Sequence, residues 1–346
     1  MAPYSVLVAG HFCIDVSPEL AAAPGLDPGR LYEVGPARLT PGGCVANTAS
    51  ALAAVGVPTR VCATVGEDPF GEVVCRLLAE HEIETEGITR TPAVATSYSI
   101  VVQPPGHDRT FWHHAGANAV FSGGDVNFDG IEILHLGYPP LLPALLVDDA
   151  EPLLTLLKEA RRRGITTSID MVVVDPRSSA GRLNWRRIFA RILPYVDLAT
   201  PSIDDLTSAL RISQAVDDGL VEDCARSLIE DGCGVAAVSA GARGVYVVSA
   251  GRDRLGSAGA ALASVAPAWA SVAEWVPAVV PRTLASTTGA GDVASAGLLY
   301  GLATGAGLRR AARLGAQFAA RSIAGERPSR EEARQWSAEL SAAGLD

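Results

Sequence analysis

The sequence predicts an α/β protein with a mostly parallel central sheet and helices on both faces. Short apolar runs with strand character alternate with segments of helical spacing along most of the chain, and no repeat of about 20–50 residues is present. The chain has 346 residues, of which 48% are hydrophobic and 19% charged. This composition supports a large buried core and excludes an intrinsically disordered chain, so we expect a single domain over residues 1–346.

The expected strands are short strand-like runs, and their alternation with helices implies a mostly parallel sheet. In chain order they cover residues 4–9, 60–65, 97–103, 131–137, 166–170, 196–199, 234–239 and 244–249. Apolar residues three and four apart predict the main helices over 44–55, 70–81, 151–163, 224–231, 292–302 and 308–323. Ligands of open α/β sheets bind at the carboxyl ends of the strands, so the loops that leave those ends are the candidates for a site.

Three regions break the alternation. Residues 16–40 are rich in Pro and Gly, and the turn 103–109 separates two β-rich pieces within 97–115, so both regions predict a small β-structured flap outside the main sheet. Residues 255–273 have little charge, but their apolarity is mostly Ala, and Ser, Gly and Pro interrupt them. We interpret this stretch as a surface excursion or an Ala-rich helix, not a membrane span.

Charge and cysteine content restrict the partners and the compartment. The formal net charge of −10 disfavours binding to nucleic acid or to an anionic membrane. The six cysteines show no CxxC pair and no zinc spacing, and the chain enters a strand directly after its first residues, which leaves no room for a signal peptide. We therefore expect a cytoplasmic protein.

The chain contains a single lysine, Lys158, in the middle of an expected helix, whereas the other 27 basic residues are Arg. A P-loop needs a lysine directly after its glycine-rich turn, and protein kinases need one on a strand. Both are therefore excluded, as is a Schiff-base lysine outside that helix. If the protein binds phosphate, it does so through backbone N–H groups, Arg and a metal ion.

The segment Gly289-Ala290-Gly291-Asp292 is the most specific motif in the sequence. Two glycines around a small residue allow a tight turn of N–H groups, and the helix expected to begin near Asp292 adds the positive end of its dipole, which together predict an anion hole. Asp292 could also be a stabilising acid at a helix start. The segment fits the dinucleotide pattern G-x-G-x-x-A as well, but the acid required about 20 residues later is missing, because the next one is Glu326.

A second glycine turn, Gly42-Gly43, leads into the helix that carries Asn47 on its first turn. The Asn47 amide can offer a donor and an acceptor to a polyol, or it can bond the local backbone. Asp15, just after the first strand, can accept hydrogen bonds from sugar hydroxyls or can be a simple turn residue. Each of these residues is ambiguous when taken singly.

The order and spacing of four motifs remove this ambiguity. They are Gly10-x-x-x-x-Asp15, Gly42-Gly43-x-x-x-Asn47, Val65-Gly66-Glu67-Asp68 after the next strand, and Thr288-Gly289-Ala290-Gly291-Asp292 near the end. Together, over residues 5–323, the chain resembles the ribokinase-like carbohydrate kinase family, also called the phosphofructokinase-B family. The resemblance implies a three-layer sandwich with a small β-lid, contributed here by about residues 16–40 and 97–115, and a homodimer formed through that lid.

The resemblance also implies an activity and its residues. Relatives use ATP and Mg²⁺ to transfer the γ-phosphoryl group to a hydroxyl, usually a primary one, of a sugar. By similarity Asp292 is the general base and the N–H groups of Gly289, Ala290 and Gly291 hold the phosphoryl oxygens. In the same way, Asp15, Gly43 and Asn47 orient the acceptor.

Other residues are assigned to the nucleotide by the same resemblance. Ser239, Gly241 and Gly244 match the family's nucleotide loop, and Thr287 lies next to the anion hole. Arg109, at the end of the lid turn, is a candidate phosphate contact or an exposed arginine that favours solubility. Residues 137–140 shape the pocket wall or form a rigid strand-end turn.

Two departures from the family pattern affect the ions. Relatives begin the late motif with an Asp that helps to bind a monovalent cation, where this chain has Ser286. They also carry Asn-x-x-Glu near the metal, where this chain has Ser202 and Asp205, so we expect Asp205 to reach Mg²⁺ through a water molecule. His113 and His114 are adjacent on a strand and point to opposite sides, which argues against a metal site.

The sequence thus predicts an ATP-dependent sugar kinase. A nucleoside kinase of the same fold is the alternative, and so is a non-catalytic sugar-binding relative. Ser286 and Ser202 motivate the non-catalytic alternative, whereas Asp292 and its two glycines argue against it.

Overall fold

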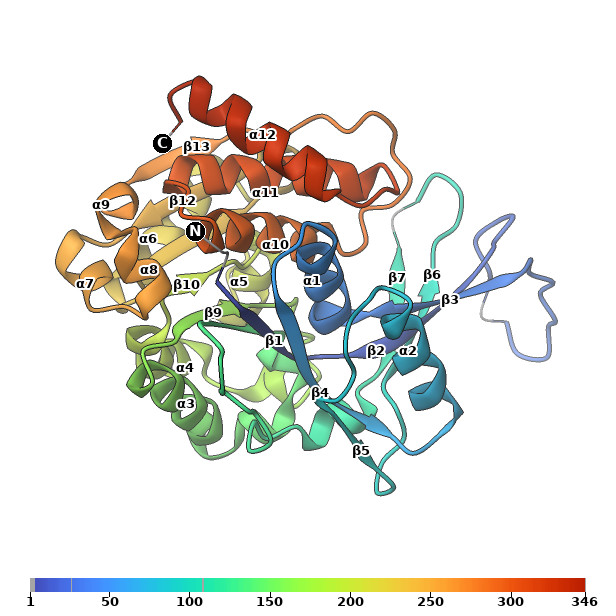
Figure 1. Ribbon diagram of the computed structural model, residues 1–346. Helices are drawn as coiled ribbons and strands as arrows, with labels where there is room; N and C mark the ends of the chain where they lie inside the picture. Colours follow the sequence, from blue (N-terminus) through green and yellow to red (C-terminus); the bar gives the residue numbers. More distant parts are fainter. Residues whose placement is uncertain (1–3, 26, 108, 346) are drawn as a thin grey trace.

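A nine-stranded sheet forms the centre of the computed structural model, which describes residues 4–25, 27–107 and 109–345 (Figure 1). The strand order in these residues is β13-β12-β11-β10-β9-β8-β1-β4-β5. All neighbours pair in parallel except β11 with β12 and β12 with β13. The strands are β1 (Val6–Gly10), β4 (Thr59–Gly66), β5 (Ile88–Thr91), β8 (Ile133–Gly137), β9 (Thr166–Asp170), β10 (Leu198–Ala199), β11 (Val235–Ser239), β12 (Val245–Ser249) and β13 (Ala273–Val276). The expected mostly parallel sheet is confirmed.

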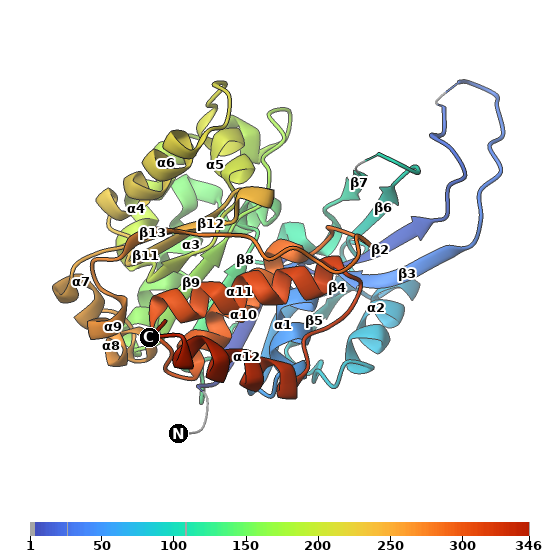
Figure 2. The same ribbon diagram turned by 90° about the horizontal axis from the view of Figure 1, so that it is seen from above.

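Helices cover both faces of this sheet (Figure 2). One face carries α1 (Gly43–Ala54), α2 (Pro69–Ala79), α7 (Arg252–Gly256), α8 (Ala260–Ser264), α9 (Ala266–Trp269), α10 (Ala290–Ala303), α11 (Leu308–Ile323) and α12 (Arg330–Ala342). The other face carries α3 (Val147–Arg162), α4 (Trp185–Ile192), α5 (Ile203–Leu210) and α6 (Asp218–Glu230). Each layer buries its own apolar cluster against the sheet, which gives the expected three layers.

A smaller sheet of four strands projects from the main body (Figure 2). Its order is β3-β2-β6-β7, with strands β2 (Cys13–Pro18), β3 (Ala37–Gly42), β6 (Tyr98–Val102) and β7 (Thr110–His114). Strands β2 and β3 overlap the two ends of segment 16–40, and β6 and β7 lie within segment 97–115; we expected these two segments to form the flap. Residue 26 of the first segment and residue 108 of the second lie outside the described residues. The described residues between β2 and β3 carry no strand and are mostly exposed.

Residues 255–273 are neither a surface excursion nor a single Ala-rich helix, which corrects our interpretation. Three short helices, α7 to α9, pack their large side chains into the core, where Leu255, Leu262 and Trp269 are each 0% exposed. Gly259 directly precedes α8, and Pro267 lies in the first turn of α9. The glycine and the proline break helical continuity, and the apolar side chains between them still require burial.

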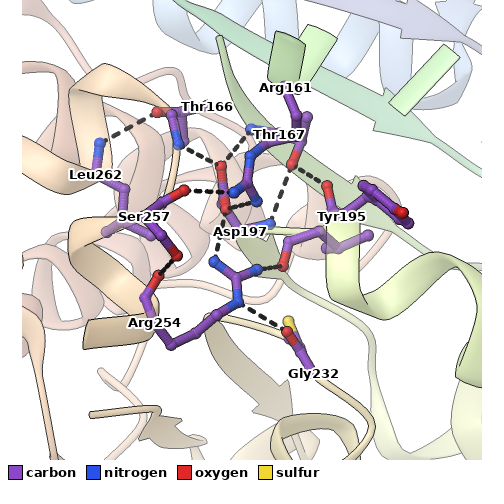
Figure 3. Close-up of polar contacts among 12 residues, drawn as sticks. Arg161, Thr166, Thr167, Tyr195, Asp197, Gly232, Arg254, Ser257 and Leu262 are labelled. Carbon is purple, nitrogen blue, oxygen red and sulfur yellow. Dashed lines mark hydrogen bonds and ion pairs between the residues drawn. The ribbon is translucent and has the colours of Figure 1, made fainter. Parts of the chain in front are cut away.

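The buried carboxylate of Asp197 connects the segment with helices α7 to α9 to the sheet (Figure 3). Asp197, at the entry to β10, is completely buried and forms ion pairs with Arg161 of α3 at 2.6 Å and with Arg254 of α7 at 3.1 Å. Its second oxygen accepts a hydrogen bond from the Gly259 N–H at 2.9 Å. Because a charge this deep needs partners, the two arginines and the backbone donor explain why the segment is held in place.

Several element boundaries differ from those expected. Helix α10 begins at Ala290 instead of Asp292, and α6 begins at Asp218 instead of Cys224, because the Asp217 side chain caps it. The helices α4, α5 and α12 and the strands β5 and β13 were not among the expected elements. No helix in the described ranges is both long enough and apolar enough to cross a membrane.

Candidate active site

The carboxylate of Asp292 is held by side chains from two distant elements. Asp292 is the third residue of α10 and is 1% exposed. Its Oδ2 accepts a hydrogen bond from Asn47 Nδ2 of α1 at 2.9 Å, and the Tyr138 hydroxyl donates to both carboxylate oxygens at 2.8 Å. The carboxylate therefore does not cap its own helix, and Asn47 bonds this carboxylate instead of its local backbone.

Burial raises the pKa of Asp292 to about 6, although the hydrogen bonds from Asn47 and Tyr138 lower it, and the charges of Asp205 and Asp15 raise it slightly. Such a carboxylate is ionised at neutral pH and is still a much better proton acceptor than an exposed aspartate. The electrostatics of this position therefore suit a general base.

Tyr138 was not assigned a role at this carboxylate by sequence reasoning, which left residues 137–140 as a pocket wall or a turn. The structure puts Tyr138 directly after β8 in a left-handed conformation, with φ of +63°, and its ring lies 5.5 Å from the ring of His11. A bulky residue rarely adopts this conformation, and Pro139 follows it. The one signal in the sequence was a tyrosine placed between a strand-end glycine and two prolines.

The glycine turn before α10 has a tight conformation that depends on glycine. Gly289 has a φ of +72°, and a Cβ at this position would lie 2.9 Å from Asn47 Nδ2, so only glycine fits. The Thr288 N–H donates to Ser286 Oγ at 3.1 Å, and the Ala290 N–H donates to the Thr287 carbonyl at 3.3 Å. The turn is thus folded without a ligand, and it lies at the positive end of a 14-residue helix.

The residues expected to bind the acceptor sugar lie close to this turn. Asp15 lies in β2, where burial raises its pKa, and its carboxylate contacts Cys13 Sγ at 3.5 Å. Gly43 begins α1 with a φ of +84°, and a side chain there would collide with His11. Asp15 and Asn47 both line a cavity of about 340 Å³ between α1, α2, β3 and the start of α10. Asp15 is therefore buried in a strand and is not a turn residue.

His11 is a further buried group at this place that sequence reasoning did not single out. It is 3% exposed, and neither ring nitrogen has a hydrogen-bond partner among the described residues. Burial and the neighbouring His113 lower its pKa, so the imidazole is neutral. Its ring lies 5.1 Å from that of His113 on the small sheet, which puts the two sheets in contact here.

Two more carboxylates lie near Asp292 on its other side. Asp205, in α5, forms a reciprocal capping box with Ser202, and burial raises its pKa to about 6. Asp170 ends β9 and is buried, and burial followed by the charges of Asp292 and Asp205 raises its pKa. Sequence reasoning missed Asp170, although an acid at the carboxyl end of a buried strand was a usable signal.

The expected nucleotide residues fall into two loops. Ser239 ends β11, and Gly241 and Gly244 follow with φ of +57° and +104°. Arg109, from the turn between β6 and β7, donates hydrogen bonds to the hydroxyl of Thr287 and, at 3.3 Å, to its carbonyl. Arg109 therefore connects the small sheet to the glycine turn. It is not an arginine that contacts only solvent.

Comparisons with known proteins indicate the family and the fold of this chain. A family model described as pfkB family carbohydrate kinase matches residues 4–331. The structure is similar to the ribokinase of Thermotoga maritima, with 20% identity and a TM-score of 0.70 over 96% of this chain and 99% of the other. It is also similar to the Arabidopsis thaliana ribokinase complexed with ribose and ATP, with 16% identity and a TM-score of 0.73 over 97% and 99% of the two chains.

A nucleoside kinase is also similar to this chain. The Burkholderia thailandensis enzyme, solved with inosine, shares 16% identity with a TM-score of 0.68 over 97% of this chain and 99% of its own. Among curated proteins, "Probable fructokinase-6, chloroplastic" of Arabidopsis thaliana is 26% identical in an alignment of 183 residues that covers 49% of this chain and 43% of that protein. The chain thus spans less than half the length of this curated relative. Because the family model covers nearly the whole chain and the ribokinase fold is shared, this protein belongs to the pfkB family of carbohydrate kinases.

Proposed function

We propose that this protein is an ATP-dependent kinase that phosphorylates a hydroxyl of a small sugar, with Asp292 as the general base. The observation that carries the proposal is the buried Asp292 carboxylate, whose pKa is raised to about 6, at the mouth of the glycine turn. The ligands of the related ribokinase, ribose and ATP, support this choice of substrates. The fold supports one kinase domain with the small sheet as its lid.

In this mechanism the acceptor hydroxyl gives its proton to Asp292 as its oxygen bonds to the γ-phosphorus of ATP. The bond between that phosphorus and the bridging oxygen breaks, and ADP leaves. Asn47 and Tyr138 occupy only part of the hydrogen-bonding capacity of the carboxylate, which leaves a lone pair for the hydroxyl. Asp15, Gly43 and Asn47 orient the acceptor.

The glycine turn and a second loop hold the nucleotide in this proposal. The N–H groups of Gly289, Ala290 and Gly291 receive the phosphoryl oxygens as their charge shifts, with Ala290 exchanging its bond to Thr287 for one to phosphate. The other nucleotide contacts come from Ser239, Gly241, Gly244 and Thr287. Because Arg109 already reaches Thr287, it would lie beside the bound phosphates when the lid is closed.

The residues present fit a magnesium ion that is held mainly by the phosphates. No three acidic, histidine or cysteine side chains in the described part of the chain form a ready metal site. However, Asp205 and Asp170 form no ion pair with a basic side chain among the described residues, and their pKa values are raised. A bound cation would stabilise their ionised forms. Mg²⁺ typically binds one or two carboxylates, substrate phosphates and waters, and it neutralises phosphate charge. Asp205 would act through a water molecule.

The small sheet would exclude water when it closes, so that ATP is not hydrolysed. It also exposes large apolar side chains: Leu39 is 40% exposed, Phe111 43% and Trp112 46%. Side chains of this kind on one small sheet support a homodimer formed through the lid.

A panel of sugars and nucleosides, each incubated with ATP and Mg²⁺ and followed by ADP release, tests the proposed function. We expect turnover with a sugar. Preferential turnover of a nucleoside would establish the alternative acceptor class. Absence of turnover with every acceptor, together with measurable sugar binding, would instead identify a non-catalytic sugar-binding relative.

Tyr138→Phe is expected to shift the pH dependence of kcat. The Tyr138 hydroxyl stabilises the ionised form of Asp292, so its removal raises the pKa of Asp292, and the acidic limb moves upward from about pH 6. A hydrogen bond to a charged group contributes roughly 1.5–3 kcal/mol, so the shift should be about one to two pH units. The measurement is kcat from pH 5 to pH 9, with Tyr195→Phe as the control. An unchanged acidic limb would show that Tyr138 does not tune this carboxylate.

Activity is expected to depend only weakly on potassium. The Ser286 side chain is neutral, and its hydroxyl already accepts a hydrogen bond from the Thr288 N–H at 3.1 Å, so a monovalent cation would lack a charged ligand here. The assay replaces potassium with tetramethylammonium at constant ionic strength. A loss of more than about tenfold, or ~1.4 kcal/mol of barrier, would contradict this expectation. Ser286→Asp is the matched variant and should gain activation by potassium.

A further inference from the structure

The cavity lined by Asp15 and Asn47, which we propose to bind the sugar, also has an arginine, Arg327, in its wall. Its volume of about 340 Å³ lies within the range of roughly 300–1,000 Å³ typical of small-molecule sites. Asp15 and Asn47 line it, and so do Ser50, His81 and Arg327. Asn47 and Ser50 lie three residues apart on α1 and therefore on the same side of this helix. A ligand held by Asp15 and Asn47 thus shares its cavity with Arg327.

Hydrogen bonds fix the position of this arginine. Arg327 Nη2 lies 2.6 Å from His81 Nε2, and His81 Nδ1 lies 3.0 Å from Ser50 Oγ, which is buried. Because a guanidinium only donates, Nε2 must accept, and Nδ1 carries the proton that is donated to Ser50. Burial and the charge of Arg327 lower the pKa of His81. His81 is therefore a neutral ring that orients the Arg327 guanidinium, and it does not compensate the positive charge of that guanidinium.

No carboxylate in the described part of the chain forms an ion pair with Arg327. The adjacent Glu326, which also lines the cavity, is paired with Arg321, which in turn binds Glu332 at 2.8 Å. The other acid on the cavity wall, Asp15, contacts Cys13. Arg327 lines the cavity and is also exposed to solvent, and partial burial lowers its pKa.

We infer that the sugar acceptor carries an acidic group, a carboxylate or a phosphate, which Arg327 binds while Asp15 and Asn47 hold the hydroxyls. This inference rests on the proposed function and names its substrate class. A guanidinium has five N–H donors arranged to match the oxygens of either anion, and His81 uses only one of them. The hydroxyls of Thr288 and Ser322, also on the cavity wall, can add further donors. A neutral sugar would leave the guanidinium without a counterion.

The test compares neutral sugars with their acidic counterparts: glucose with gluconate, fructose with fructose 6-phosphate, and ribose with ribose 5-phosphate. ADP release gives kcat/KM for each compound with the unmodified protein and with Arg327→Gln. We expect at least one acidic compound to be preferred over its neutral counterpart by about tenfold or more, and the variant to lose this preference. A preference for gluconate would show that a carboxylate is bound, and a preference for a sugar phosphate would show that a phosphate is bound.

Arg330→Gln is the matched control, because this arginine lies three residues away and does not line the cavity. It should keep the preference, and Arg327→Lys should keep part of it. The inference is wrong if neutral sugars are preferred, if Arg327→Gln lowers both members of a pair equally, or if the variant mainly raises the KM for ATP.

A second readout separates this inference from the proposed function. If no compound is phosphorylated, the proposed function fails for these sugars, and calorimetry without ATP decides the inference. Binding of an acidic sugar that is lost in Arg327→Gln but kept in Arg330→Gln would support the anion site. Equal binding by the unmodified protein and Arg327→Gln, or no binding at all, would overturn it.

Discussion

Asp292→Asn is expected to lower kcat by roughly 10²–10⁴, with little change in ATP affinity. The amide cannot accept the proton of the acceptor hydroxyl, but it occupies the same space and can still bond Asn47 and Tyr138. Steady-state kinetics and calorimetric titration with ATP provide the measurements, and Asp204→Asn, an exposed acid on α5, is the control. A loss confined to KM would contradict the role of Asp292 as the base.

The same variant is expected to be more stable at neutral pH. The pKa of Asp292 is raised from 3.8 to about 6 in the folded protein, so ionising it there costs up to about 3 kcal/mol above pH 6. Below pH 4 the carboxyl is protonated in both the folded and the unfolded chain, and this cost disappears. Denaturant unfolding should therefore show a gain of about 1–3 kcal/mol for Asp292→Asn at pH 7 and none near pH 3.

Asn47→Asp is expected to lower kcat at pH 7 by about 10²-fold and to restore part of it at higher pH. The substitution puts a second carboxyl where Nδ2 now lies 2.9 Å from Asp292 Oδ2. Two carboxylates this close share one proton, so the pair ionises completely only well above pH 6. Asp292 then no longer accepts a proton at neutral pH, and the kcat profile from pH 6 to pH 9.5 should rise steeply.

Asn47→Ala separates this electrostatic effect from the loss of a hydrogen bond. The alanine variant loses the donor to Asp292 and a contact to the acceptor, for which we expect an approximately tenfold loss without recovery at high pH. Matching profiles for Asn47→Asp and Asn47→Ala would show that the two side chains are not coupled. Unchanged folding of both variants, checked by thermal unfolding, is required for this comparison.

Most of the main sheet could be predicted because its signals are local. Strands such as β1, Val6–Gly10, are continuous apolar runs, and α11, Leu308–Ile323, has a clear helical period. Elements without such signals were missed: β13 has only 4 residues, and α7 to α9 are too short to show a period. Their conformation depends on packing against the sheet and on the buried Asp197, which lies 62 residues from its partner Gly259.

The sequence by itself determined the residues of the glycine turn, because Gly289, Gly291 and Asp292 lie within four successive positions and their chemistry follows from local backbone geometry. It also excluded a lysine-dependent phosphate site by composition alone. The surroundings of Asp292 required the tertiary structure, since Asn47 is 245 residues away from it and Tyr138 is 154 residues away. The raised pKa of Asp292 and the cavity that joins Asp15 to Arg327 likewise arise only when distant segments pack together, because burial and Coulomb interactions depend on distance in space and not on distance along the chain.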